Sequence, residues 1–135
     1  MKKNSDNNTN SKKSNLSSSK ISNLKNRKDE AKLGGGAARQ EAQHSKGKKL
    51  ARERLSLLFD NGQFTEIDPF VKHNSSDFGL DKTRIDGDSV ICGYGNVHGQ
   101  QVFAFSQDFT VLGGSLSKVA SNKICKAFDL AIKTG

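Results

Sequence analysis

The sequence predicts a mixed α/β domain in which a β-hairpin is followed by a long helix. Two β-rich runs, 89–97 and 101–107, flank a short turn that contains Gly99, which is a strong hairpin signal. Behind them, apolar residues recur at helical spacing from Leu116 to Ile132. All eight Phe and the single Tyr lie at position 59 or later, so we expect the folded core in the second half of the chain.

The charge divides the 135-residue chain at nearly the same point. Residues 1–54 carry 15 Lys/Arg and 5 Asp/Glu, a net charge of +10, whereas residues 55–135 carry 7 and 9, a net charge of −2. Ser, Asn and Lys make up 19 of the first 25 residues. Such a composition buries too little apolar surface to offset the entropy of ordering the backbone.

Three segments follow from this division: a disordered tail over 1–23, a helical lead-in over 24–62, and the start of the folded domain over 63–135. The lead-in contains three predicted helices, each ended by glycine or by turn residues. They cover residues 22–33, 37–46 and 49–59. Helices this short are not stable alone, so we expect them to pack on the domain.

In the second half, the pattern predicts a short extended segment within 64–70 and a surface loop over 71–88. The second strand of the hairpin is apolar on both faces, so we expect it to be covered on both sides. Ser115 or Ser117 is expected to cap the final helix. Cys125 lies near the apolar stripe of that helix and is predicted to be a small buried thiol.

Several classes of protein are excluded by the composition. No run of about 18 apolar residues is present, which excludes a membrane-spanning helix. Two cysteines, Cys92 and Cys125, are too few for a disulfide scaffold or an all-cysteine zinc site. His44, His73 and His98 have no ligand spacing to them, so no metal site is expected. Neither a Walker sequence nor a Gly-x-Ser-x-Gly elbow occurs.

The basic first half suggests nucleic acid as a partner, but it contains no aromatic residue to stack on a base. A solvated tail is therefore the favoured interpretation, and no nucleic acid and no membrane are expected as partners. A mitochondrial presequence would also be basic, Ser-rich and poor in acids, yet no Arg precedes Arg27 and apolar residues are few. We expect a cytoplasmic protein, with the mitochondrial matrix as the alternative.

The stretch 105–117 joins a predicted strand to a predicted helix. It places Gly113 and Gly114 beside the hydroxyls of Ser115 and Ser117. Backbone N–H groups at a helix start suit a phosphate or another anionic group. A tight turn that needs glycine for its backbone explains the same residues, and the two interpretations stay open at this point.

Residues 107–116, Gln-Asp-Phe-Thr-Val-Leu-Gly-Gly-Ser-Leu, resemble the signature of the carboxyltransferase (β) subunit of biotin-dependent acyl-CoA carboxylases. The similarity continues over about residues 24–135 and is nearest to the propionyl-CoA type. The sodium-pumping methylmalonyl-CoA decarboxylases are similar enough to stay an alternative. Further stretches agree in the same order, at 33–36, 42–47, 51–58, 77–79, 87–90 and 123–126.

This resemblance implies a partial crotonase-like (ββα superhelix) domain and transfer of a carboxyl group from carboxybiotin to the α-carbon of a short acyl-CoA. Biotin would be carried by a biotin carboxylase or biotin carrier partner, and other carboxyltransferase subunits would complete a homo-oligomer. In the family the oxyanion hole for the thioester lies beyond residue 135, so no catalytic residue is assigned. Gly113, Gly114 and Ser115 are the expected contacts to CoA, and no metal is expected.

One departure from the family pattern concerns the third helix. The family has Gly-Lys-Leu-Thr before this helix, whereas here residues 47–50 are Gly-Lys-Lys-Leu, so a Thr cap worth about 1 kcal/mol is lost. Arg52 and Arg54 in that helix are expected to pack and to bridge subunits rather than to do chemistry.

A helix that follows a buried strand usually leads to a parallel strand, and none follows residue 135. We therefore expect a truncated domain that is inactive by itself. A non-catalytic assembly or complementing fragment of such a subunit is the alternative function.

Overall fold

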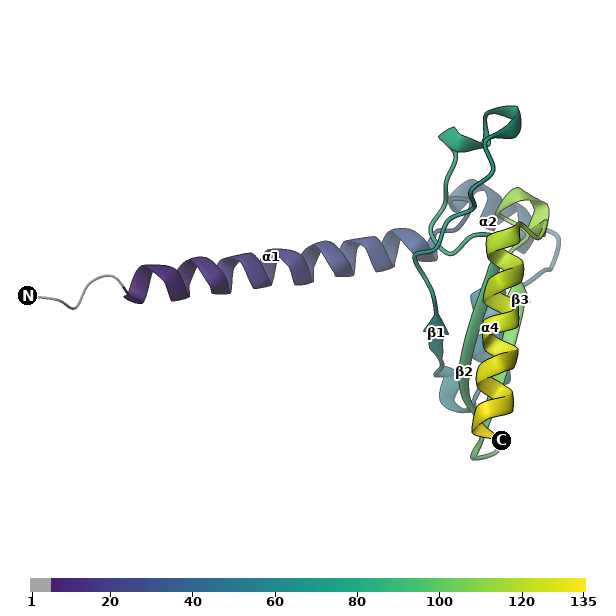
Figure 1. The fold of residues 1–135 in the computed structure, drawn as a ribbon. Coiled ribbons are helices and arrows are strands. Elements are labelled where there is room, and N and C mark those ends of the chain that lie inside the picture. Colours follow the sequence, from purple (N-terminus) through teal and green to yellow (C-terminus); the bar gives the residue numbers. More distant parts are fainter. Residues whose placement is uncertain (1–5) are drawn as a thin grey trace, which may run out of the picture.

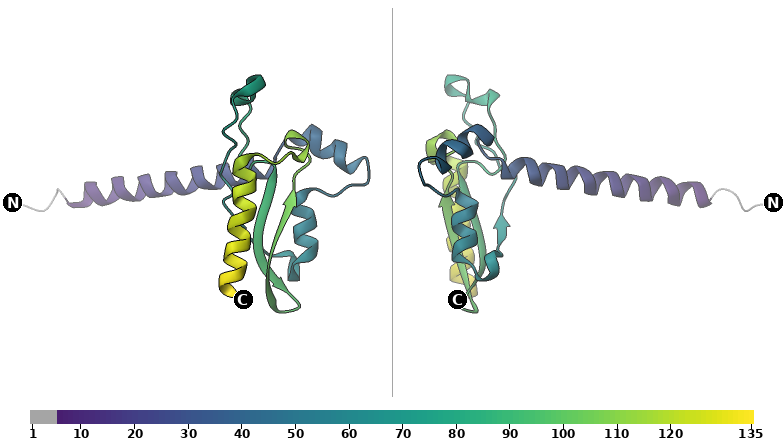
Figure 2. Two further views of the ribbon diagram at one scale, coloured as in Figure 1. Left: turned by 45° about the vertical axis from the view of Figure 1, so that its right-hand side comes forward. Right: turned by 180° about the vertical axis from the view of Figure 1, so that it is seen from behind.

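A three-stranded antiparallel sheet with helices on both faces forms the body of the computed structural model, which describes the backbone of residues 6–135 and the side chains of residues 17–135 (Figure 1). The strand order is β1-β2-β3. Figure 2 shows α3 and α4 on opposite sides of the hairpin, while the long helix α1 projects away from the body. The bounds are β1 Thr65–Ile67, β2 Val90–Val97, β3 Gln100–Gln107, α1 Asp6–Lys32, α2 Ala37–His44, α3 Ala51–Leu58 and α4 Lys118–Thr134.

The hairpin is confirmed, with Val90 opposite Gln107 and Val97 opposite Gln100. Its turn has positive φ at His98 (52°) and Gly99 (78°), as a two-residue hairpin turn requires. The Asp60 carboxylate accepts hydrogen bonds from the N–H groups of His98 (3.0 Å) and Gly99 (2.9 Å). The backbone of this turn is thus anchored to the end of the helical lead-in.

Strand β2 divides the apolar residues into two cores, since alternate side chains of a strand point to opposite faces. On one face, Val90 and Cys92 pack with Ile67 and with Ala120 and Ala127 of α4. On the other face, Ile91 packs with three residues of the α3 region, namely Ala51, Leu55 and Phe59. The central strand therefore holds the two helices to one sheet.

The predicted burial is confirmed in part for the hairpin and is wrong for the cysteines. We expected at least the second strand of the hairpin to be covered on both sides. Phe103 of β3 does pack on the α4 side, and Val102 and Ala104 pack on the α3 side. However, β3 is at the edge of the sheet and Phe105 is 44% exposed, whereas residues 90–93 of β2 are buried. The short segment β1 pairs with β2 and makes it the central strand. Cys125, expected to be buried, is exposed on α4, and Cys92 is the buried thiol.

Helix α1 differs from the expected disordered tail, because it continues the predicted helix back to Asp6 (Figure 1). No Gly or Pro occurs between residues 6 and 32, so nothing in the sequence ends a helix there. The side chains of residues 17–30 are all exposed, so they add nothing to either core. Residues 1–5 of the predicted tail lie outside the described residues, and the segment boundaries at 23 and 62 stay predictions.

The predicted surface loop over 71–88 is confirmed over most of its middle part, where residues 74–79 and 81–84 are exposed. A 3-10 helix, η2 (Asp77–Lys82), projects from the body, and Phe78 in this helix is fully exposed. At the base of the loop His73 is buried, and its Nε2 lies 3.1 Å from the Thr83 carbonyl oxygen. Residues 87–89 are buried as well, so the last part of the stretch belongs to the core.

The lead-in docks on the segment after β3 through glycines. The N–H of Gly35 donates to the Thr110 hydroxyl at 3.0 Å. A Cβ atom at Gly35 would lie 1.8 Å from the Thr110 carbonyl oxygen, and one at Gly34 would lie 2.7 Å from the Asp108 carboxylate. The motifs 33–36 and 107–116, each with consecutive glycines, are therefore in direct contact.

Gly35→Ala is expected to destabilise the protein by about 3 kcal/mol, because the added methyl group meets backbone that cannot move aside. The matched control is Gly47→Ala, where φ is +69° but nothing lies within 4 Å of an added Cβ; it should cost only about 1 kcal/mol. Urea unfolding of the two variants measures the difference. Equal losses would contradict the close docking at Gly35.

Leu50→Thr is expected to stabilise the protein by about 1 kcal/mol, because Leu50 occupies the N-cap of α3 and has no side-chain acceptor. The Glu53 carboxylate already accepts from the Leu50 N–H at 2.7 Å, so a threonine would complete the capping box. The midpoint of urea unfolding measures this gain. Leu50→Ala, which removes apolar surface without adding a cap, should lower the midpoint, and a Thr variant no better than Ala would contradict the capping argument.

Candidate functional site

The loop between β3 and α4 contains the three residues predicted to contact CoA. It includes a short 3-10 helix, η3 (Leu112–Gly114), with positive φ at Gly113 (64°) and Gly114 (77°). Gly113 is exposed, and nothing lies within 4 Å of an added Cβ. Gly114 is buried, and a Cβ there would lie 2.9 Å from the Phe109 ring, whereas Ser115 is exposed.

Two of the backbone N–H groups that we expected to bind a ligand instead donate hydrogen bonds within the loop. The Gly114 N–H donates to the Val111 carbonyl at 2.8 Å, and the Ser115 N–H donates to the Leu112 carbonyl at 3.2 Å. The loop presents to solvent the bare backbone of Gly113, the side chain of Ser115, and the side chains of Phe109 and Leu116, which are 46% and 50% exposed. The tight-turn interpretation thus describes the inner side of the loop, and a ligand can reach only its outer side.

The start of the loop is fixed by Asp108, which is buried. Its carboxylate accepts hydrogen bonds from the Thr110 N–H at 2.9 Å and from the Thr110 hydroxyl at 2.6 Å. Near the end of the loop, the Gln107 side-chain amide donates to the Gly114 carbonyl at 3.0 Å. The side chains of Gln107, Asp108 and Thr110 therefore form hydrogen bonds within the loop.

A second set of buried polar residues lies beneath the loop and was not found from the sequence. The Ser89 hydroxyl donates to the Ser115 carbonyl, and the Ser117 hydroxyl donates to the Asp88 carboxylate. Asp88 is 1% exposed and Ser89 is 0% exposed. Sequence reasoning placed both residues at a loop end or strand start and had no signal that linked them to residues 115–117.

Lys123 is buried on the inner face of α4 and was also missed. Its ammonium group donates to the carbonyl oxygens of Gly87 (3.0 Å) and Val90 (2.7 Å). Burial lowers the pKa of Lys123 from its ordinary value. A usable signal existed, because Lys123 is three residues after Ala120 and four before Ala127, the buried positions of this helix.

Arg52 and Arg54 pack within the chain, as predicted. Two nitrogens of Arg52 donate to the Glu66 carboxylate at 3.1 and 3.0 Å. Arg54 donates to the Gln107 carbonyl, and its guanidinium lies 5.4 Å from the centre of the Phe109 ring. Arg54 thus connects α3 to the signature loop, while the predicted bridge between subunits stays a prediction.

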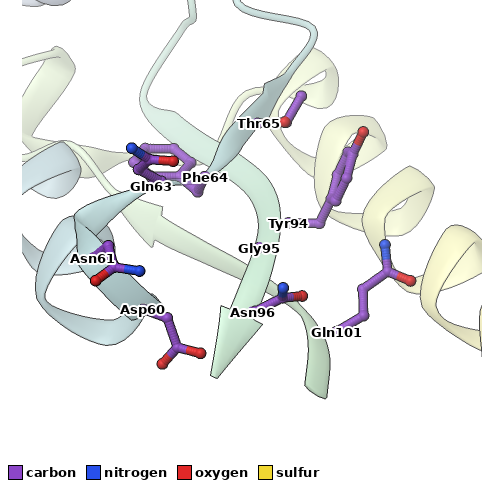
Figure 3. Close-up of a pocket in the computed structure, with 9 residues that line it drawn as sticks. All are labelled: Asp60, Asn61, Gln63, Phe64, Thr65, Tyr94, Gly95, Asn96 and Gln101. Carbon is purple, nitrogen blue, oxygen red and sulfur yellow. The ribbon is translucent and has the colours of Figure 1, made fainter. Parts of the chain in front are cut away.

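A polar pocket of about 430 Å3 lies at the other end of the hairpin, beside its turn (Figure 3). Its lining comes from the segment that follows α3, from β1 and from both strands of the hairpin, and includes Asp60, Thr65, Tyr94, Asn96 and Gln101. None of the predicted CoA contacts lines this pocket. Among the described residues, no cluster of metal-ligating side chains and no membrane-spanning helix is found.

Residues 42–135 match the family described as the carboxyl transferase domain. The chain belongs to this family. Its signature loop, identified above from residues 107–116, lies inside the matched region. The resemblance stated from the motifs is thereby confirmed at the level of the family.

Curated relatives of this carboxyl transferase domain agree with the match. The chain is 53% identical over 114 residues to the mitochondrial propionyl-CoA carboxylase beta chain of Homo sapiens, covering 83% of this chain and 21% of that protein. It is 51% identical over 120 residues to methylmalonyl-CoA decarboxylase subunit alpha of Propionigenium modestum, covering 89% of this chain and 23% of that protein. The chain thus spans less than a quarter of the length of these relatives.

Solved structures confirm the predicted fold class, a mixed helix-and-strand part of a crotonase-like domain. A crystal structure of transcarboxylase 12S with methylmalonyl-coenzyme A and methylmalonic acid bound matches with a TM-score of 0.83 and 40% identity, covering 87% of this chain and 23% of that one. A single-chain, multi-domain long-chain acyl-CoA carboxylase matches with a TM-score of 0.74 and 23% identity, covering 84% and 13%. The second match supports the fold alone.

The two thiols are expected to react very differently with a disulfide reagent at about pH 8. Cys125 is exposed, whereas burial raises the pKa of Cys92 to about 11, so its reactive thiolate is scarce in the folded protein. One thiol per chain should react quickly in buffer and both should react in guanidinium. Cys125→Ser should remove the fast reaction, and a fast reaction that persists in this variant would show that Cys92 is accessible.

Proposed function

We propose that the protein takes part in carboxyl transfer between biotin and a short acyl-CoA, with propionyl-CoA as the foremost substrate. The observation that carries the proposal is the signature loop, which presents Gly113 and Ser115 to solvent at the start of α4. It does so in a chain about half identical to a propionyl-CoA carboxylase beta chain. The outer side of this loop would contact the CoA part of the substrate.

The assignment of residues follows from what the loop exposes. Gly113 allows a ligand to approach the backbone closely, because no side chain covers it. The Ser115 hydroxyl can donate to or accept from a polar group of CoA. Gly114 is expected to act through conformation, since its N–H is used within the loop.

Carboxybiotin, carried by a biotin carboxylase or carrier partner, would supply the carboxyl group. The pocket of Figure 3 lies at the opposite end of the hairpin from the signature loop, so we assign no described residue to biotin. Other carboxyltransferase subunits are the proposed partners in a homo-oligomer. The decarboxylase system stays the alternative, because a decarboxylase subunit is similar over 89% of the chain.

An assembly or complementing role is the second candidate, and the outer face of α4 favours it. Phe128 is 55% exposed and Ile132 is 81% exposed, and Phe105 packs edge-on against Phe128 at 5.9 Å. An apolar face of this kind suits contact with another polypeptide. In this role the chain would bind a polypeptide that carries the rest of a carboxyltransferase subunit and would restore its activity.

We place the protein in the cytoplasm, with the mitochondrial matrix as the alternative. A presequence helix is amphipathic. In α1 the side chains of residues 17–30 are all exposed, and only Ile21 and Leu24 among them are large and apolar. The alternative stays because a human relative is a mitochondrial chain.

Binding of propionyl-CoA to the 135-residue chain tests the proposed contact, using calorimetry. Gly113→Asn should weaken binding by about tenfold or more, because asparagine tolerates positive φ but adds a side chain to the contact surface. Gly99→Asn is the matched control, since Gly99 also has positive φ and open surroundings but lies in the hairpin turn. Equal effects of the two variants, or no binding by the unchanged chain, would contradict the proposal.

Replacing the matching segment of the human propionyl-CoA carboxylase beta chain by this chain tests the activity. With its biotin-bearing partner, the chimaera should fix labelled bicarbonate in the presence of propionyl-CoA. A folded but inactive chimaera would contradict the proposed reaction. Mixing the separate chain with a beta chain that lacks the segment tests the second candidate, which predicts recovery of activity without a covalent link.

A further inference from the structure

We infer that Asp88, Ser89 and Lys123 are positioning residues that fix the conformation of the signature loop for contact with CoA. The inference rests on the proposed function for its ligand, but the arrangement itself is independent of it. The three residues are 1%, 0% and 2% exposed. Buried polar groups of this kind are costly unless they are paired, and each of the three is paired toward the loop or the turn beneath it.

Lys123 makes the first set of contacts, between α4 and the turn at 88–89. Its ammonium group binds the carbonyls of Gly87 and Val90, which lie on either side of the pair Asp88–Ser89. Asp88 has positive φ (54°), which is uncommon for a residue with a side chain. Its carboxylate also accepts from the Ser89 N–H at 2.8 Å. The ammonium group of Lys123 therefore connects α4 to this turn through two hydrogen bonds between the helix and the sheet.

Ser89 and Asp88 make the second set of contacts, between the turn and the two ends of the short segment 115–117. Ser89 binds the carbonyl of Ser115, and Asp88 binds the hydroxyl of Ser117. The same Ser117 hydroxyl accepts from the Ala120 N–H at 3.0 Å and caps α4. The turn at 88–89 thus fixes both the end of the loop and the start of the helix.

The orientation of one peptide group shows the consequence. The structure has no cis peptide bond in its described part, and the C=O and N–H of a trans peptide point in opposite directions. Since the Ser115 carbonyl points inward to Ser89, the N–H of Leu116 points away from Ser89. Without Ser89, this peptide could rotate, and both the exposed hydroxyl of Ser115 and the Leu116 N–H would lose their fixed direction.

Hydrogen exchange measured by NMR on the 135-residue chain without ligand tests this positioning. Ser89→Ala should speed exchange of the Gly114 and Ser115 amides by roughly fivefold, the effect of one lost hydrogen bond. Ile67→Val is the matched control, because it loosens the core of the α4 face at a site away from the loop. Ser117→Ala should affect the first turn of α4 in the same way through the loss of its cap.

The inference is overturned if the loop amides exchange no faster in Ser89→Ala than in Ile67→Val. Because this measurement uses no CoA, it decides the inference even when the unchanged chain fails to bind propionyl-CoA, a failure that counts against the proposed function alone. In the active chimaera, Ser89→Ala should raise KM for propionyl-CoA by roughly fivefold and leave kcat within about twofold. A fall in kcat at constant KM would contradict a role in positioning the bound CoA.

Discussion

The packing of the fold and the geometry of the signature loop both depend on the burial of strand β2 between α3 and α4. Alternate side chains of this strand pack on α3 and on α4, so a one-residue shift of its register would exchange the two cores. The strand can be central only because the three residues of β1 pair with its outer edge. Burial of β2 also forces the backbone polar groups at its start to find partners, since water does not reach them. Those partners come from α4 and from the loop after β3, which joins the packing of the fold to the geometry of the candidate site.

Lys123 shows how this requirement is met. A lysine on the inner face of α4 would ordinarily be unfavourable, and burial indeed lowers its pKa. Its ammonium group nevertheless satisfies the two carbonyls that flank the Asp88–Ser89 turn. The side chains of Asp88 and Ser89 form hydrogen bonds with Ser117 and Ser115. The buried side of the signature loop is thus bound by Asp88 and Ser89, which lie 26 or more positions earlier in the chain than their partners. Gly113 and the Ser115 side chain stay exposed to solvent.

The lead-in contributes to the same loop from the other side. Gly35 lies so close to Thr110 that no other residue fits there, and Asp108 orders Thr110 through its carboxylate. Arg54 of α3 adds a contact to the Gln107 carbonyl. Three motifs that are separate in the sequence, 33–36, 51–58 and 107–116, therefore meet at one place. Their meeting gives a physical reason for their shared occurrence, because motifs 33–36 and 51–58 each supply a contact that holds the signature loop.

The sequence by itself determined the family, the hairpin and the final helix, because turn glycines, strand alternation and helical spacing are local patterns. It also located the signature loop and the packing role of Arg52 and Arg54. It did not determine that β2 rather than β3 is the central strand, since this depends on the edge with which the three residues of β1 pair. It also did not determine that Cys92 rather than Cys125 is buried, since this depends on which face of α4 packs on the sheet. Nor did it link Asp88 and Ser89 to Ser115 and Ser117. Only the tertiary structure decided those contacts, because buried polar groups find their partners in space and no spacing along the chain encodes that choice.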